Sequence, residues 1–264
     1  MKGICKLCLK DSILRNSHII PRSYYKNLKE NGKLVMVHKG KHSTVGNFDP
    51  KEPMLCDDCE QYLSTTFENY GIRVLRDWSN VRKNSDHIII KSFNYEKYYL
   101  YLLSILWRAS ISKHSHFQGV VGNESLDDAL RHCILQNKLR FNKLSRLSID
   151  KFIKICIFRI VDSSGTFNDD AIKGIVSNVG QSYDDTIDAV IWSFIADGFL
   201  IIYSISPGKD FYDMMTKKYK SQLNKGSHQK IMKIEIKNSP ILLTTFGNVV
   251  QALENSIIHP SQNS

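Results

Sequence analysis

The sequence predicts an α+β protein in which a small cysteine-bound module precedes a larger domain of mixed helices and strands. Two Cys-x-x-Cys pairs, Cys5 with Cys8 and Cys56 with Cys59, enclose a segment that has little hydrophobic core of its own. After the second pair, apolar residues recur at helical spacing, and in the second half of the chain they form strand-like runs. These two observations separate the module from the domain.

We assign the module to residues 1–78 and the α+β domain to residues 79–264. With 264 residues, of which 42% are hydrophobic, the chain is large enough to bury a core. Its 36 basic and 26 acidic residues give a formal net charge of +10, which favours polyanions such as nucleic acid as partners. Many basic proteins bind no nucleic acid, so the charge alone does not decide between partners.

Each Cys-x-x-Cys pair places two thiolates at a spacing that fits half of a tetrahedral zinc site. We therefore predict one structural zinc ion held by Cys5, Cys8, Cys56 and Cys59. Four reduced cysteines without a metal are the alternative. The other two cysteines, at positions 133 and 156, are expected to be free thiols in the core.

Between the two pairs we expect a long loop. The segment Lys29–Pro53 combines glycines and prolines with many charges, and only Leu34–Val37 suggests a short strand. A helix is expected to begin at Cys59 and to run to about Trp78, because apolar residues recur there at three- and four-residue steps. These apolar residues are Leu63, Phe67, Tyr70, Val74, Leu75 and Trp78.

The next helix is expected to be the centre of the core. A short β-branched strand at His87–Ile90 precedes the run Tyr95–Ser112, which is apolar on most sides. Arg108, near the end of this run, should cap backbone carbonyl groups or pair with an acid. A further helix is expected from Ser125, in a capping-box-like sequence, to about Asn137.

Strand-like sequences dominate the remainder of the chain. Phe152–Val161 is rich in isoleucine and phenylalanine, and Ala189–Ile195 with Phe199–Ile205 flank the hairpin turn signal Asp197-Gly198. The other expected elements are a basic helix at Phe211–Leu223, a strand from Ile231 to Lys237 and a last helix after Gly247.

The apolar run from Tyr98 to Trp107 is shorter than the roughly 20 residues that a membrane span requires. The first cysteine, at position 5, leaves no room for the apolar core of a signal peptide. We therefore expect a cytoplasmic protein with no membrane partner. In that reducing compartment, paired cysteines favour a metal over disulfides.

The module resembles the HNH nucleases. The shared pattern is Cys-x-x-Cys, then Ser-His-Ile-Ile-Pro at Ser17–Pro21, then Leu-Cys-x-x-Cys at Leu55–Cys59, with the metal-binding side chain of Glu60 directly after it. The resemblance extends weakly to Trp107–Ser110. It implies a zinc-bound treble clef that carries a ββα-metal active site.

The resemblance assigns roles to individual residues. His18 would be the general base that activates water, and Glu60 would be a ligand of a catalytic Mg²⁺ or Mn²⁺ ion. Asn47 would position the catalytic histidine. Arg22 and Lys26 would bind phosphate groups of the nucleic acid. We expect His18 and Glu60 to face one cleft.

Three positions depart from the family pattern or leave alternatives open. Ser17 stands where many HNH enzymes have an acidic metal ligand, and His42 is an alternative to Asn47. Glu68, eight residues after Glu60, is a candidate for a further carboxylate, but a regular helix rotates it by about 80° from Glu60, which makes shared ligation of one ion awkward. The simpler expectation places Glu68 at the surface.

Each candidate residue also has a simpler, non-catalytic explanation. In that explanation His18 is a core residue hydrogen-bonded to the backbone, and Glu60 is an acid that interacts favourably with the helix dipole. The basic run Lys217–Lys220 fits either a second phosphate-contact patch or a solvated helix face. His114 and His116 are expected to be loop residues.

Two functions follow as hypotheses. The first is a metal-dependent endonuclease that cuts DNA, or alternatively RNA, with the resemblance suggesting a role in bacterial anti-phage defence or in a mobile element. The second is a non-catalytic zinc treble clef that binds nucleic acid or a partner protein. In either case the larger domain would serve regulation, partner binding or homo-oligomerisation.

Overall fold

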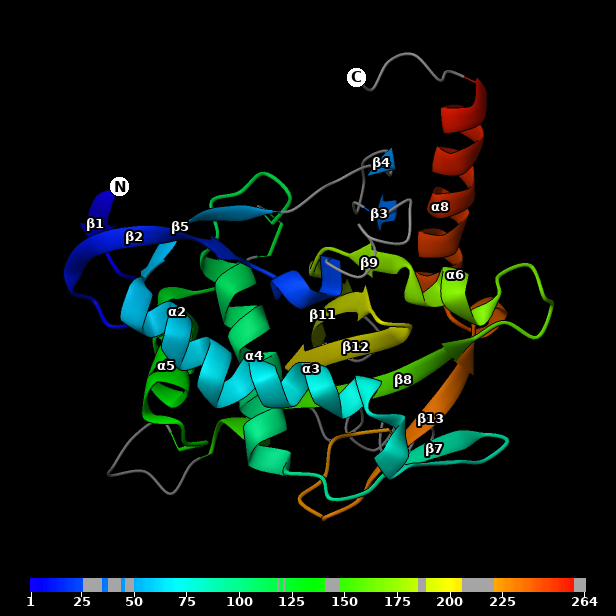
Figure 1. Ribbon diagram of the computed structural model, residues 1–264, viewed down its shortest axis with the longest axis horizontal. Coiled ribbons are helices and arrows are strands. Elements are labelled where there is room, and N and C mark those ends of the chain that lie inside the picture. The colour runs from blue at the N-terminus through cyan, green and yellow to red at the C-terminus, as the bar shows by residue number, and fades with distance from the viewer. Residues whose placement is uncertain are drawn as a thin grey trace.

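The computed structural model describes residues 1–25, 35–37, 44–45, 50–117, 119–120, 122–140, 148–184, 189–205 and 221–258 (Figure 1). Runs of strands are followed by runs of helices, and most strand pairs are antiparallel, which agrees with the predicted α+β class. Within these residues no helix is long and apolar enough to cross a membrane.

The described helices are α2 (Asp57–Leu63), α3 (Asn69–Arg76), α4 (Tyr95–Ile111), α5 (Glu124–Gln136), α6 (Asp169–Lys173) and α8 (Pro240–Ile258). A π-helical turn, Ser64–Glu68, joins α2 to α3, and residues 22–25 form a helical turn. The described strands are β1 (Lys2–Ile4), β2 (Asp11–His18), β3 (Val35–Val37), β4 (Thr44–Val45), β5 (Lys51–Cys56), β6 (Val81–Lys83), β7 (His87–Ile90), β8 (Ile153–Val161), β9 (Ile175–Ser177), β10 (Gly180–Asp184), β11 (Ala189–Ala196), β12 (Phe199–Ile205) and β13 (Gln229–Glu235).

A seven-stranded sheet forms the larger domain, in the order β10-β11-β12-β8-β13-β7-β6, and within it β8 and β13 run parallel. Alternate residues of β8 belong to two hydrophobic clusters, because successive strand side chains point to opposite faces. Ile155 and Ile157 lie in the larger cluster, whereas Phe158 and Ile160 lie in the smaller one with α8. The sheet is therefore covered on both faces.

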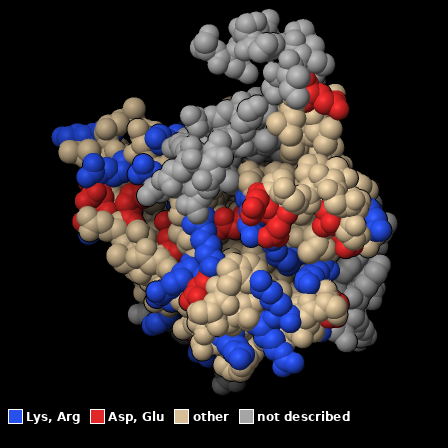
Figure 2. All heavy atoms as spheres, turned by 45° about the vertical axis from the view of Figure 1, so that its right-hand side comes forward, with Lys and Arg blue, Asp and Glu red and all other residues tan. Residues whose placement is uncertain are grey.

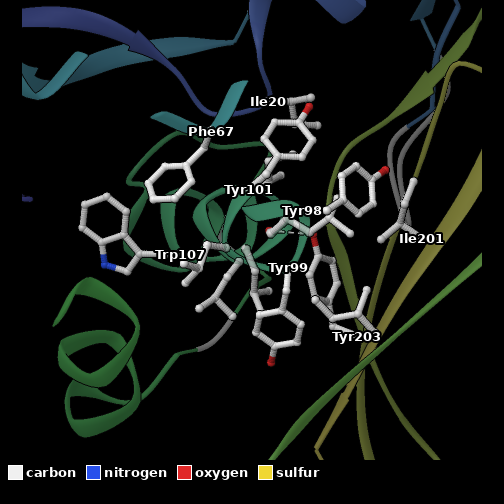
Figure 3. Close-up of a cluster of buried hydrophobic side chains, with 14 of the residues drawn as sticks. Ile20, Phe67, Tyr98, Tyr99, Tyr101, Trp107, Ile201 and Tyr203 are labelled. Atoms are coloured by element: carbon white, nitrogen blue, oxygen red, sulfur yellow. Dashed lines mark hydrogen bonds between the residues drawn. The ribbon is translucent and has the colours of Figure 1, made fainter. Parts of the chain in front are cut away.

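Helix α4 is the centre of the larger cluster, as predicted, and its residues from Tyr98 to Ala109 are buried. The hydroxyl group of Tyr203 on β12 donates to the Leu102 carbonyl oxygen at 2.8 Å, which fixes α4 against the sheet. Figure 3 shows Ile201 and Tyr203 on one side of α4 and Phe67 of the π turn on the other. One core thus joins the sheet, α4 and the helices of the module.

The module begins with a small antiparallel sheet in the order β1-β2-β5, followed by α2. Its buried residues, among them Cys5 and Leu55, belong to the same cluster as α4. Arg76 on α3 adds a polar link, since its guanidinium donates to the Ser23 carbonyl oxygen at 3.0 Å and pairs with Asp197 at 2.6 Å. These contacts hold the module against the sheet.

The hairpin between β11 and β12 forms where the Asp-Gly signal predicts it. Asp197 and Gly198 have φ values of 50° and 75°, the left-handed values that a tight hairpin turn requires. Strand β7 has the predicted bounds, and β8 begins one residue after the start of the predicted run Phe152–Val161. The free, buried Cys133 and Cys156 thiols are confirmed as well.

Several predicted boundaries are wrong. Helix α5 is capped by Asn123, whose side-chain oxygen accepts from the Leu126 N–H at 2.8 Å, rather than by the predicted Ser125. Helix α2 begins at Asp57 instead of Cys59, and α8 begins at Pro240, so Gly247 lies inside it. In the predicted helix at 211–223, the described residues 221–223 are not helical, and the rest lie outside the described residues. A short strand, β6, lies between the helix expected to end near Trp78 and the strand expected at His87–Ile90.

Gly71 allows α3 to lie directly against α4. A methyl group at this position would lie 2.1 Å from the Tyr101 ring, whereas one at Gly247 would meet nothing within 4 Å. We predict that Gly71→Ala lowers the free energy of unfolding by roughly 1–3 kcal/mol through overpacking. Gly247→Ala, the matched control in a helix, should raise it by up to about 1 kcal/mol. Urea unfolding measures both, and equal effects of the two variants would contradict the close approach.

Candidate metal centre and adjoining cavity

The four cysteines of the two Cys-x-x-Cys pairs converge on one point. The Sγ atoms of Cys5, Cys8, Cys56 and Cys59 all lie within 4.8 Å of one another, and those of Cys8 and Cys56 are 3.9 Å apart. A tetrahedral ion bound to sulfur at about 2.3 Å separates two sulfurs by about 3.8 Å, so the spacing fits a metal such as zinc. All four thiols are free rather than joined in disulfides.

Hydrogen bonds and burial shift the pKa values of the Cys5 and Cys59 thiols in opposite directions. Burial acts to raise the pKa of the Cys5 thiol, but hydrogen bonds from backbone N–H groups, including that of Cys56, lower it to about 7. Burial and the neighbouring thiols raise the pKa of Cys59. Several thiolates cannot coexist at this distance unless a positive charge compensates them, and a bound metal ion would do so.

The two cysteine pairs are held together by the backbone. The Cys56 N–H donates to the Sγ atom of Cys5 at 3.3 Å, and the Lys6 N–H donates to the Met54 carbonyl oxygen at 3.0 Å. Arg131 on α5 donates to the Leu7 carbonyl oxygen at 3.2 Å. The first pair is thus fixed to β5 and to the larger domain.

A cavity of about 350 Å³ lies beside the second cysteine pair. It is lined by His18, Arg22, Glu60, Gln61, Ser64, Thr65, Glu68 and Arg108. His18 is the last residue of β2, and Glu60 directly follows Cys59 in α2. The structure therefore brings His18, Glu60 and Arg22 to one cavity.

Glu60 is in an environment that disfavours its charged form. Burial raises the pKa of the Glu60 carboxyl group, and the negative charge of Glu68 adds to this effect. The Ser17 hydroxyl and the Arg108 guanidinium oppose the shift. Its Oε1 atom is buried and has no hydrogen-bond partner within the described part of the chain. A cation at this oxygen would stabilise the carboxylate.

Glu68 also lines the cavity, so the expectation that it lies at the surface is wrong. The Asn69 N–H donates to the Ser64 carbonyl oxygen, five residues earlier, and this π turn accommodates one extra residue. At about 100° per residue, Glu68 then lies near the angular position of the seventh residue after Glu60, about 20° away instead of 80°. No feature of the sequence that we recognised indicates the π turn.

Arg108 reaches the cavity from α4. Its Nη1 atom donates to the His18 carbonyl oxygen at 2.9 Å and pairs with Glu68 at 2.9 Å, and its Nε atom donates to the Ser104 carbonyl oxygen at 3.2 Å. These contacts confirm the prediction that it caps carbonyl groups or pairs with an acid. The sequence does not predict that Arg108 lines the cavity, because only the tertiary fold brings α4 next to the residues of β2 and α2.

Ser17 belongs to the sheet rather than to the cavity lining. It is fully buried, and its Oγ atom accepts from the Leu55 N–H at 3.1 Å. The position at which the family pattern has an acidic ligand is therefore used for β2–β5 pairing. The hydroxyl also contributes to the environment of Glu60, as described above.

Several predicted residues lie outside the described part of the chain. These are Asn47, His42, Lys26 and the run 217–220. His114 and His116 lie in the described loop after α4, where their rings stack with centroids 4.9 Å apart. Among the described residues, only the four cysteines form a group that can hold a metal through three or more such side chains.

On the face that Figure 2 shows, the basic Lys and Arg side chains are interspersed with acidic Asp and Glu side chains.

Comparison of the chain with models of protein families, with curated proteins and with solved structures found no match.

Proposed function

We propose that the protein is an HNH-like endonuclease that hydrolyses phosphodiester bonds of DNA, with a zinc-bound treble clef as the scaffold of its active site. The observation that carries the proposal is that His18, Glu60 and Glu68 line one cavity beside the four-cysteine cluster. The pair β2–β5 followed by α2 has the order of elements that a ββα-metal site requires. RNA is the alternative substrate.

Each group of the cavity has a role in this reaction. His18 would accept the proton of the attacking water, and the Glu60 carboxylate would hold a Mg²⁺ or Mn²⁺ ion, with Glu68 as a second carboxylate in the same cavity. The ion supplies polarisation of the scissile phosphate and stabilisation of the leaving oxygen. Arg22, which is exposed at the rim, would bind a neighbouring phosphate group.

The wider roles rest on the resemblance. We propose a cytoplasmic effector of anti-phage defence, or an enzyme of a mobile element, in which the larger domain binds a regulatory protein or a second copy of the chain. Asn47 and Lys26 keep their proposed roles as the residue that positions His18 and as a phosphate contact.

A non-catalytic zinc module that binds nucleic acid or a partner protein is the second candidate. The observation that favours it is Ser17, since its buried hydroxyl serves the sheet where the family pattern has a metal ligand. The two candidates differ in one property, which is cleavage.

The test is incubation of purified, zinc-loaded protein with supercoiled plasmid in the presence of Mg²⁺ or Mn²⁺. We expect nicked or linear DNA with the ion and none without it. The control omits the ion and adds no chelator, because a chelator would also remove structural zinc. If neither ion supports cleavage above the level of ion alone, the endonuclease proposal is wrong.

Arg22→Ala should weaken binding of a DNA duplex at all sequences, because the side chain contacts the backbone rather than the bases. The loss of one phosphate contact should reduce the slope of log affinity against log salt by about 1. Fluorescence anisotropy of a labelled duplex at several salt concentrations measures this slope. Arg82→Ala removes an exposed arginine of β6 that does not line the cavity, and it is the matched control. Equal slopes in the two variants would contradict the role of Arg22.

A further inference from the structure

The Arg108 guanidinium carries a hydrogen-bond donor that no residue in the described part of the chain accepts. Of its five N–H groups, one on Nε donates to Ser104 and those on Nη1 reach the His18 carbonyl oxygen and the Glu68 carboxylate. Its Nη2 atom is buried and has no hydrogen-bond partner among the residues that the structure describes. The whole side chain is only 2% exposed. A buried donor without a partner costs free energy, so such a group requires an explanation.

The same cavity contains the opposite kind of group. The Glu60 Oε1 atom is a buried acceptor that has no hydrogen-bond partner among the described residues, and Glu60 and Arg108 line the cavity together. One buried donor and one buried acceptor of this cavity thus require partners that the described residues do not supply.

A divalent ion bound to a phosphate group satisfies both requirements. We propose that Arg108 is a substrate-binding residue whose Nη2 group donates to a non-bridging oxygen of the phosphodiester, while Glu60 binds the ion that the phosphate shares. This inference rests on the proposed function and adds to it a phosphate contact that comes from α4 of the larger domain. The module alone would then lack one part of its site.

The other contacts of Arg108 suit such a role. The bonds to Ser104, His18 and Glu68 hold the guanidinium plane in one orientation, so little freedom remains to be lost when phosphate binds. The bond to the His18 carbonyl oxygen also fixes the guanidinium relative to the proposed general base. Arginine suits this position better than lysine, because the five N–H donors of its planar guanidinium can bond to these partners and to a phosphate at the same time.

The first experiment measures binding of inorganic phosphate to the full-length, zinc-loaded protein in the presence of Mn²⁺, by isothermal titration calorimetry. We expect Arg108→Lys to bind phosphate roughly 10- to 100-fold more weakly, the effect of one charge-assisted hydrogen bond. Arg159→Lys is the matched control, since Arg159 is a buried arginine of β8 that does not line the cavity. It should leave phosphate affinity unchanged.

Two results of the titration would overturn the inference. One is equal phosphate affinity in the wild type and in a folded Arg108→Lys variant. The other is an equal loss in Arg159→Lys, which would show that the loss of any buried arginine acts through stability. Thermal melting of both variants, recorded with the titration, shows whether each protein is folded.

DNA cleavage separates this inference from the proposed function. If the phosphate contact forms in the transition state, Arg108→Lys should lower kcat at least tenfold, and Arg159→Lys should not. Cleavage and phosphate affinity that are both unaffected by Arg108→Lys would disprove the contact and leave the endonuclease intact. Phosphate binding that depends on Arg108, in a protein that cleaves no DNA, would support the contact and disprove the endonuclease.

A measurement on the wild type keeps the proposal testable if Arg108→Lys does not fold. In a crystal structure of the protein with Mn²⁺ and inorganic phosphate, a phosphate oxygen should lie about 3 Å from Nη2 of Arg108. Phosphate bound elsewhere, or no bound phosphate, would overturn the inference.

Discussion

Cys56→Ser should unfold the amino-terminal module and abolish zinc binding. The Sγ atom of Cys56 is one of four that lie within 4.8 Å of one another, and a serine hydroxyl is a poor zinc ligand. The binding free energy of structural zinc, roughly 10–16 kcal/mol in small zinc-binding peptides, contributes directly to folding.

The measurement combines zinc content by mass spectrometry with thermal melting. Cys133→Ser is the matched control, because Cys133 is also fully buried but lies outside the cluster. Its Sγ atom lies 3.6 Å from the Leu139 carbonyl oxygen, which a serine hydroxyl can also use as an acceptor. Cys133→Ser should retain zinc. If Cys56→Ser retains the zinc content and melting temperature of the wild type, the four-cysteine site is wrong.

His18→Ala should reduce DNA cleavage by about 10²- to 10⁴-fold, the usual contribution of a general base. The substitution removes only the imidazole. The His18 carbonyl oxygen, which accepts from Arg108 at 2.9 Å, and the pairing of β2 with β5 both remain, so the fold should be preserved. Zinc content and melting temperature should therefore stay close to those of the wild type.

The assay compares initial rates of plasmid nicking at saturating Mg²⁺ or Mn²⁺. His132→Ala is the control, since His132 lies on α5 and does not line the cavity. Full activity in His18→Ala would move the general base to another residue. A His18→Ala protein that loses zinc as well as activity would instead indicate a structural role for this histidine.

Much of the fold could be predicted because it depends on local sequence. The Asp197-Gly198 turn forms because its residues tolerate left-handed φ values, and α4 is central because it is apolar on most sides. Helix starts were less predictable. Asn123 and Ser125 are both good capping residues, and the surrounding structure decides which one ends the loop.

The cysteine spacing by itself determined that two Cys-x-x-Cys pairs would meet, and the position of His18 and Glu60 beside them determined that both would lie near the four-cysteine cluster. Only the tertiary structure decided which other charges join them. Glu68 enters the cavity because one π turn changes the rotation of the helix, and Arg108 enters because α4 is buried between the module and the sheet. Helical phase and long-range packing are properties of the folded chain, whereas the ligand spacing of a Cys-x-x-Cys pair is already present in four consecutive residues.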